Sequence, residues 1–154
     1  MSLTEGKNIL VYVETAGDAP VGPALEILAK AKELAGAKGE KVIAAIFGKE
    51  PQEAAKASIE AGADEAVVVT TEENRPEVLA SMLAKLVEKY APSLVLAAAT
   101  QAGKDIAPLT AKKFEAGCVT DAMNIVADGD NYVFTCPVYG GNILNDVLLH
   151  TRPA

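Results

Sequence analysis

The sequence has no tryptophan, and it has only one histidine and two cysteines among its 154 residues. His150 on its own cannot form a histidine-rich metal site, and the carboxylates are scattered without the spacing of metal ligands. We therefore predict no metal centre. Cys118 and Cys136 lie far apart and form no Cys-x-x-Cys pair, so we expect free, mostly buried thiols in a reducing cytoplasm.

Positive charge is also in short supply. Lys and Arg total 14 against 21 Asp and Glu, which gives a net charge of −7. Such a chain is repelled by phosphate backbones, and its dispersed basic residues do not form the patch that an anionic membrane attracts. The longest apolar runs are far too short to cross a bilayer. We expect no nucleic-acid partner and no membrane partner.

Half of the residues are hydrophobic, which is enough for a sizeable core. Continuous apolar segments are typical of strands covered on both faces, and apolar residues three and four apart mark amphipathic helices. Gly36 and Gly39 are expected to end the first helix, after a loop that contains Gly17 and Pro20. Four strands alternate with four helices, which predicts an α/β fold with a mostly parallel sheet. The predicted strands are residues 8–13, 42–47, 66–69 and 94–98, and the predicted helices are residues 23–35, 51–61, 76–90 and 104–114.

The pattern changes after Gly117, where three strand-like segments follow one another without a helix between them. They are residues 123–127, 132–138 and 143–149, separated by turn signals at residues 128–131 and 140–142. We expect antiparallel strands at the edge of the sheet, with Tyr132, Phe134 and Cys136 on one face. No linker interrupts the chain, so residues 1–154 are predicted to form one domain.

The segment after the fourth strand is the first place to seek a ligand, because parallel sheets bind ligands at the carboxyl ends of their strands. A phosphate-binding loop would need Gly at position 98 and Ser or Thr at position 105, where the chain has Ala98 and Asp105. Gln101, Gly103 and Lys104 are therefore weak candidates for cofactor binding. The alternative is a tight turn followed by a capped, polar first helical turn.

No catalytic residue is predicted. The first strand is not followed by Gly-x-Gly-x-x-Gly, and the sequence has no Gly-x-Ser-x-Gly elbow. We interpret His150 as a surface or interface residue and Asp121 as a backbone cap.

Several segments of the second half resemble, in their order, the N-terminal domain of the electron transfer flavoprotein alpha subunit. They are residues 100–108 (TQAGKDIAP), 111–114 (AKKF), 120–121 (TD), 137–142 (PVYGGN) and 151–153 (TRP). The resemblance covers essentially the whole chain. It implies a three-layer, Rossmann-like fold of the adenine-nucleotide-alpha-hydrolase type. Two positions depart from the family, which often has Arg where this chain has Cys136 and Leu109.

The resemblance also implies a function. In the family, the second domain of the alpha subunit holds FAD, and the beta subunit holds AMP. The N-terminal alpha domain packs against the beta subunit, supports the flavin domain and takes no part in catalysis. The complex carries electrons from dehydrogenases to an acceptor. The family's flavin-binding motifs and its C-terminal FAD domain are absent from this sequence, so we expect residues 1–154 alone to bind no cofactor.

We expect the segment from Tyr132 to Leu149, and the surface near His150, to face a partner, because apolar content is high there for a sheet edge. A second interpretation is a free-standing nucleotide-binding domain of the universal-stress-protein type. Domains of that type have a second glycine cluster and a Gly-Ser pair after the fourth strand. The segment 114–118 contains one glycine and no Gly-Ser pair.

Overall fold

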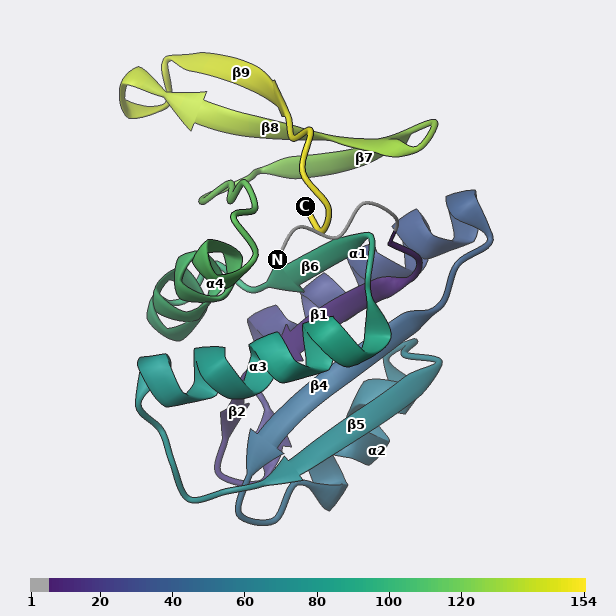
Figure 1. The fold of residues 1–154 in the computed structure, drawn as a ribbon, viewed down its shortest axis with the longest axis vertical. Coiled ribbons are helices and arrows are strands. Elements are labelled where there is room, and N and C mark those ends of the chain that lie inside the picture. Colours follow the sequence, from purple (N-terminus) through teal and green to yellow (C-terminus); the bar gives the residue numbers. More distant parts are fainter. Residues whose placement is uncertain (1–5) are drawn as a thin grey trace.

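A parallel sheet of four strands forms the centre of the protein in a computed structural model that describes residues 6–154 (Figure 1). The strand order is β5-β4-β1-β6, and Ile9 in β1 pairs with Val42 in β4 and with Leu94 in β6. All five residues of β1 are buried, as the continuous apolar pattern predicted. The strands are β1 (Ile9–Val13), β4 (Val42–Gly48), β5 (Glu65–Thr70) and β6 (Leu94–Ala97).

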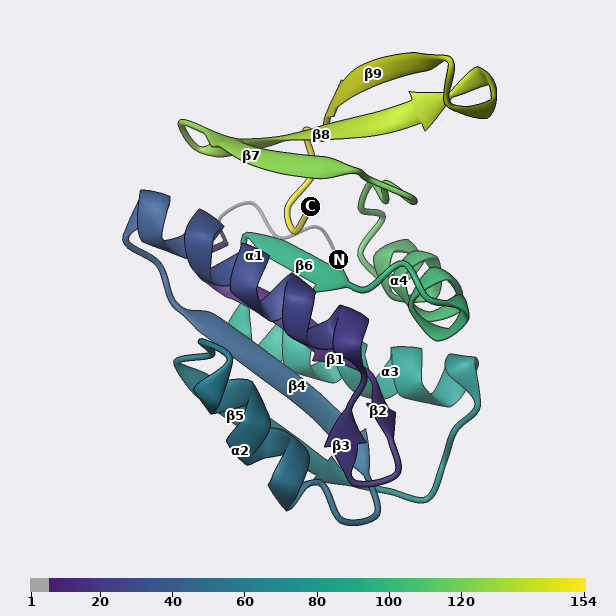
Figure 2. The ribbon, with the colours of Figure 1, turned by 180° about the vertical axis from the view of Figure 1, so that it is seen from behind.

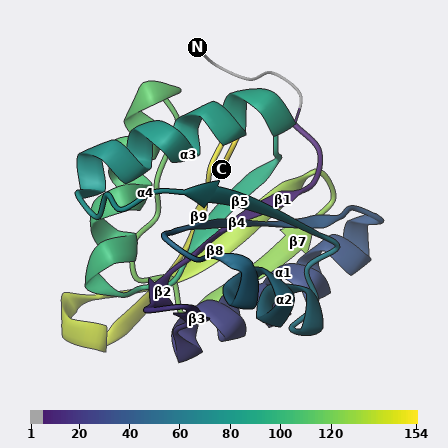
Figure 3. The same cartoon turned by 90° about the horizontal axis from the view of Figure 1, so that it is seen from below.

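Helices cover both faces of this sheet, which confirms the predicted three-layer α/β fold (Figures 2 and 3). On one face, α1 (Gly22–Lys38) and α2 (Gln52–Glu60) bury alanines and leucines against one side of β1 and β4. On the other, α3 (Pro76–Tyr90) and α4 (Gln101–Lys113) pack against the opposite side of the same strands.

Three local features differ from the predictions. Gly36 lies inside α1, and only Gly39 ends the helix, with a left-handed φ of 65°. Helix α4 begins at Gln101, three residues earlier than predicted, because Thr100 caps it. The loop after β1 contains a small hairpin of β2 (Thr15–Ala16) and β3 (Ala19–Pro20).

The three predicted antiparallel strands are confirmed as β7 (Asn124–Asp128), β8 (Asn131–Val138) and β9 (Ile143–Leu148), with a 3-10 turn, η1 (Tyr139–Gly141), between the last two. They form a sheet of their own beside the β6 edge instead of extending its hydrogen-bond ladder (Figure 1). The reason is that Ala154 occupies this edge. Its N–H donates to the Ser93 carbonyl at 3.1 Å, and its carbonyl accepts from the Val95 N–H at 2.9 Å.

The inner face of the antiparallel sheet packs onto the core. Tyr132, Phe134 and Cys136 alternate along β8 and are all buried, which confirms the predicted shared face. They join the same apolar cluster as α1 and the parallel strands. The antiparallel sheet is therefore built into the core on the α1 face of the parallel sheet.

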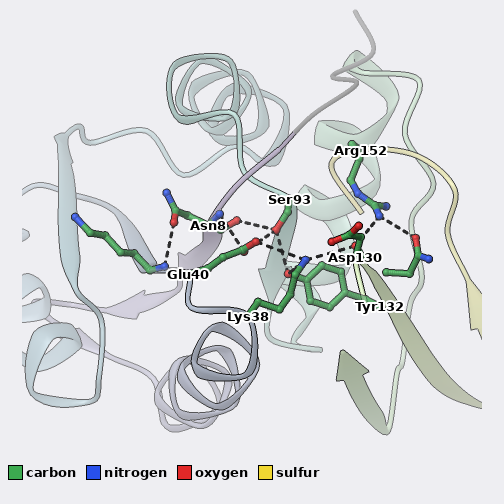
Figure 4. Close-up of polar contacts among 9 residues, drawn as sticks. Asn8, Lys38, Glu40, Ser93, Asp130, Tyr132 and Arg152 are labelled. Atoms are coloured by element: carbon green, nitrogen blue, oxygen red, sulfur yellow. Dashed lines mark hydrogen bonds and ion pairs between the residues drawn. The ribbon is translucent and has the colours of Figure 1, made fainter. Parts of the chain in front are cut away.

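A polar network reinforces this packing at the amino-terminal ends of the parallel strands (Figure 4). The Glu40 carboxylate accepts hydrogen bonds from the Asn8 N–H and the Ser93 hydroxyl, both at 3.0 Å. The Lys38 ammonium lies 3.5 Å from its other oxygen, and both charged side chains are nearly buried, at 12% and 9% exposure. The Ser93 hydroxyl also lies 3.0 Å from the hydroxyl of Tyr132 on β8, so the network joins the two sheets.

The network extends to the turn between β7 and β8. Lys38 lies over the Tyr132 ring, 4.5 Å from its centre, and donates to the Asp130 carbonyl at 3.4 Å. The Arg152 guanidinium donates to the same carbonyl at 2.7 Å and to the Asn131 side chain at 2.9 Å. The C-terminal segment, the β7–β8 turn and the end of α1 thus share one set of contacts.

None of the helices that the structure describes combines the length and the apolar character needed to cross a membrane.

We predict that Glu40→Ala lowers the free energy of unfolding by about 3 kcal/mol, because it leaves the nearly buried Lys38 ammonium without its carboxylate and removes an acceptor from two donors. Urea unfolding followed by circular dichroism measures the change. Glu33→Ala, which removes an exposed ion pair with Lys30, is the control and should change stability by less than about 0.5 kcal/mol. Equal effects of the two variants would contradict the prediction.

Candidate functional site

The start of α4 is a capped helix terminus built from contacts within the chain. The Thr100 side-chain oxygen accepts the Gly103 N–H at 3.1 Å, which is an N-cap, and its hydroxyl donates to Glu14 at 2.5 Å. Glu14 follows β1, so this cap also ties the carboxyl ends of β1 and β6 together.

Gly103 is buried where α4 passes closest to the end of β6. A Cβ atom on this residue would overlap the carbonyl oxygen of Ala98. The residue is therefore a glycine because of a close backbone approach, and this requirement is independent of any phosphate.

The other two sequence candidates make contacts of their own. The Gln101 amide donates to Asp105 at 3.0 Å along the helix. The Lys104 ammonium forms an ion pair of 2.7 Å with Asp121, whose backbone adopts a left-handed φ of 55°. Asp121 thus pairs with a lysine, where the sequence had suggested a backbone cap. Gln101, Gly103 and Lys104 lie together on one helical turn. Gln101 and Lys104 already contact Asp105 and Asp121, and Gly103 packs against the Ala98 carbonyl.

A larger hollow lies at the carboxyl ends of β1, β4 and β5, the usual place for a ligand in a parallel sheet. It is a cleft of about 450 Å³. Its apolar wall comes from Phe47, Leu79 and Ala102, and its polar residues are Tyr12, Glu14, Thr15, Lys49, Thr71, Glu72, Glu73 and Asn74. The sequence did not predict this cleft, because its polar residues come from three separate loops. The available signal was that Glu14, Lys49 and Glu72 each stand just beyond a predicted strand.

The charge of the cleft is negative. Three glutamates line it against the single lysine, Lys49, which pairs with Glu72 at 2.9 Å. Glu73 pairs with Arg75, and Glu14 is hydrogen-bonded to the neutral Thr100. A phosphate group would meet uncompensated negative charge here, which is unfavourable in a partly desolvated site.

The outer face of the antiparallel sheet is the third candidate. Residues directly opposite one another share a face, so Val126, Val133 and Leu148 form one apolar row across the three strands. Pro137 and Leu144 form a second apolar pair on the same face. Between them runs a polar row of Asn124, Thr135 and Asp146. We use outer face for these eight residues.

Large apolar side chains are exposed on this face and at its margins. Val126, Leu144 and Leu148 are 44%, 56% and 40% exposed. At the margins, Met123 is 68% and Tyr139 is 80% exposed. The sequence predicted a partner surface between Tyr132 and Leu149 but not at Met123 and Val126. Because these two residues lie three positions apart, strand alternation gave no signal that both are exposed.

The remaining sequence candidates do not assemble into a site. His150 is exposed beyond the end of β9, as a surface residue. Cys118 is exposed and Cys136 is buried, and both are free thiols. Burial raises the pKa of the Cys136 thiol, and the nearby Asp121 and Asp146 raise it further, so this thiol is poorly suited to act as a nucleophile. Among residues 6–154, no group of three or more His, Cys, Asp or Glu side chains is placed to hold a metal ion.

The three layers and the parallel sheet give the chain a Rossmann-like fold of the adenine-nucleotide-alpha-hydrolase-like type. A solved structure of a universal stress protein from Archaeoglobus fulgidus superimposes with a TM-score of 0.50 over 65% of this chain and 90% of that chain, at 12% identity. At this identity the likeness concerns the fold alone.

A model of the electron transfer flavoprotein domain matches residues 9–154, and the chain belongs to that family. The alpha subunit of the electron transfer flavoprotein from Thermoanaerobacterium thermosaccharolyticum is 30% identical over 146 residues, which are 92% of this chain and 44% of that protein. The LctC subunit of the lactate dehydrogenase (NAD(+),ferredoxin) from Acetobacterium woodii is 30% identical over 152 residues, covering 96% of this chain and 36% of that protein. The chain spans less than half the length of these relatives. The predicted resemblance to the N-terminal domain of the alpha subunit is confirmed.

We predict that Gly103→Ala destabilises the domain by about 3 kcal/mol, because the added methyl group must displace either α4 or the end of β6. Thermal and urea unfolding measure the loss. Gly36→Ala is the matched control. This glycine is also helical, has open space around its Cβ position and should gain up to about 1 kcal/mol. Similar changes for both variants would show that helix propensity, and not close approach, governs Gly103.

We also predict that the chain binds neither AMP nor ATP more tightly than about millimolar, a free energy of roughly −4 kcal/mol. The glutamates of the cleft repel phosphates, and Lys104 is already paired with Asp121. Isothermal titration calorimetry with each nucleotide is the measurement. A micromolar dissociation constant that is weakened by Lys104→Gln would contradict the prediction and would favour the universal-stress-protein type.

Proposed function

We propose that this chain is a non-catalytic assembly domain of an electron transfer flavoprotein alpha subunit. In this role it holds a beta subunit and a flavin domain in the arrangement that accepts electrons from dehydrogenases. The observation that carries the proposal is the combination of family membership with an exposed apolar outer face on a sheet whose inner face is built into the core.

The relatives support a role in electron transfer. They are named as subunits of electron transfer flavoproteins, and others are named as the LctC subunit of a lactate dehydrogenase and as the beta electron transfer subunit of an acryloyl-CoA reductase. These names suggest that the complex formed by this chain serves a dehydrogenase or a reductase, and we place that complex in the cytoplasm. Substrate chemistry would then take place on the dehydrogenase and electron storage on the flavin.

The beta subunit is the partner that we assign to the outer face. An apolar face of this kind on a natural sheet is normally covered, because its exposure favours nonspecific association. The polar row of Asn124, Thr135 and Asp146 crosses the middle of the face, and the Thr135 hydroxyl donates to Asp146 at 2.7 Å. Apolar rows flanking a polar row give the mixed composition of subunit interfaces.

We further propose that FAD is held by another domain of the complex and AMP by the beta subunit. Among the described residues, the cleft is negatively charged. The start of α4 is capped by Thr100, and its Lys104 is paired with Asp121. Neither place suits a dinucleotide phosphate. The universal-stress-protein type is the second candidate because of the shared fold. The charge of the cleft and the pairing of Lys104 favour the assembly domain over it.

The test is binding to a cognate beta subunit, measured by calorimetry and by size-exclusion chromatography. Leu144→Asp is expected to weaken binding at least tenfold, about 1.4 kcal/mol, because it removes an interface leucine and places a charge there. Tyr139→Asp should act in the same direction. Ile59→Asp is the matched control, because Ile59 is 45% exposed on α2, away from the antiparallel sheet, and binding should not change. Unchanged binding of Leu144→Asp would refute the assignment of this face.

A further inference from the structure

The cleft at the carboxyl ends of β1, β4 and β5 contains a polar group that the fold itself does not use. Tyr12 lines the cleft, and only 6% of its surface is exposed. Its hydroxyl forms no hydrogen bond with any residue in the part of the chain that the structure describes. The hydroxyl of a buried tyrosine usually finds a hydrogen-bond partner, and here that partner has to come from the open side of the residue.

Tyr12 lines the cleft, and its oxygen is not fully enclosed by protein. Within residues 6–154, every fully buried side-chain nitrogen or oxygen has a hydrogen-bond partner. An unpartnered Tyr12 oxygen must therefore keep contact with open space, and the open space that Tyr12 lines is this cleft. The ring itself is held in place by Phe47, whose ring centre lies 6.0 Å away. The ring is thus held at the wall of a preformed hollow.

Glu14 supplies a charge beside this hydroxyl. The other glutamates of the cleft are neutralised, Glu72 by Lys49 and Glu73 by Arg75. The Glu14 carboxylate has no positively charged partner among the described residues and accepts a side-chain hydrogen bond only from the neutral Thr100. The cleft therefore combines one unbalanced carboxylate, one unpartnered hydroxyl and the apolar wall of Phe47 and Leu79.

We infer that this cleft binds a small organic cation, an amine whose ammonium group pairs with Glu14 and hydrogen-bonds to the Tyr12 oxygen while its apolar body lies against Phe47 and Leu79. An ammonium group balances the single charge and donates to the hydroxyl oxygen at once. A carboxylate or phosphate of the same size can accept a hydrogen bond from the hydroxyl, but Glu14 repels its charge. A cleft of about 450 Å³ has room for a ligand of this kind.

Burial, and secondarily the charge of Glu14, raise the pKa of Tyr12 to about 12. A tyrosine hydroxyl is neutral at physiological pH and this shift keeps it so, and the cleft presents one unbalanced negative charge and not two. A monocation is the matching ligand. The inference does not depend on the proposed assembly role, because the outer face and the cleft are formed by different elements and the test needs no partner subunit.

The experiment is a titration of the ¹⁵N-labelled chain followed by two-dimensional NMR. The probe is phenethylamine, and the matched control ligand is 3-phenylpropionate, which replaces the ammonium group by a carboxylate on the same phenylethyl body. Phenethylamine should shift the amide signals of Glu14, Gly48 and Thr71 in a saturable manner. 3-Phenylpropionate should bind at least tenfold more weakly. Equal binding of the two probes, or no saturable shift with phenethylamine, would overturn the inference.

Two variants locate the site. Glu14→Gln keeps an acceptor for Thr100 but removes the charge, and Tyr12→Phe removes only the unpartnered oxygen. We expect phenethylamine binding to weaken at least tenfold in the first and at least threefold in the second. Glu53→Gln and Tyr139→Phe are exposed controls away from the cleft and should leave binding unchanged. Since Glu14 is only partly buried, Glu14→Gln should stay folded, and unchanged binding in it would refute the inference even if Tyr12→Phe were destabilised.

Discussion

The nearly buried carboxylate of Glu40 is the constraint on which the arrangement of the two sheets depends. A charge in this position costs free energy unless it is paired and hydrogen-bonded, and Lys38, the Asn8 N–H and the Ser93 hydroxyl together meet that requirement. The Ser93 hydroxyl is also hydrogen-bonded to the hydroxyl of Tyr132, which belongs to the antiparallel sheet. Because the two sheets share no ladder of backbone hydrogen bonds, this network supplies the directional contacts that apolar packing lacks. It therefore fixes how the antiparallel sheet sits on the core.

Once that sheet is fixed, strand geometry decides which side chains remain outside. Side chains alternate between faces, so placing Phe134 against the core turns Val133 outward, together with Val126 and Leu148 on the neighbouring strands. The exposed apolar row is thus a necessary consequence of how the sheet is docked. A slip of one residue in register would bury the outer face and expose the Tyr132 ring, and it would break the contacts to Ser93 and Lys38.

Sequence patterns predicted the elements better than their contacts. Helix α3 has the predicted bounds because Pro76 opens it, Pro92 follows it and its apolar residues keep the helical period. Gly36 misled the prediction because one glycine costs a helix only about 1 kcal/mol, which the packing of α1 outweighs. The ion pair of Lys104 with Asp121 depends on the left-handed backbone conformation of Asp121, which sets the direction of its side chain. The sequence around Asp121 does not predict that conformation. The pairing of Ala154 with the β6 edge is similarly a long-range contact.

The cleft shows why two proteins with the same fold can bind different ligands. In a parallel sheet the loops after the strands determine the chemistry, and the strands determine only where those loops meet. Here Glu14 stands directly after β1, where it accepts a hydrogen bond from the cap of α4 and remains electrically unbalanced. An anion is therefore disfavoured at the position that the fold makes most accessible to ligands. A family member that kept these strands but placed a lysine at position 14 would reverse the sign of the site, so charge at this one position separates phosphate binding from amine binding on the same scaffold.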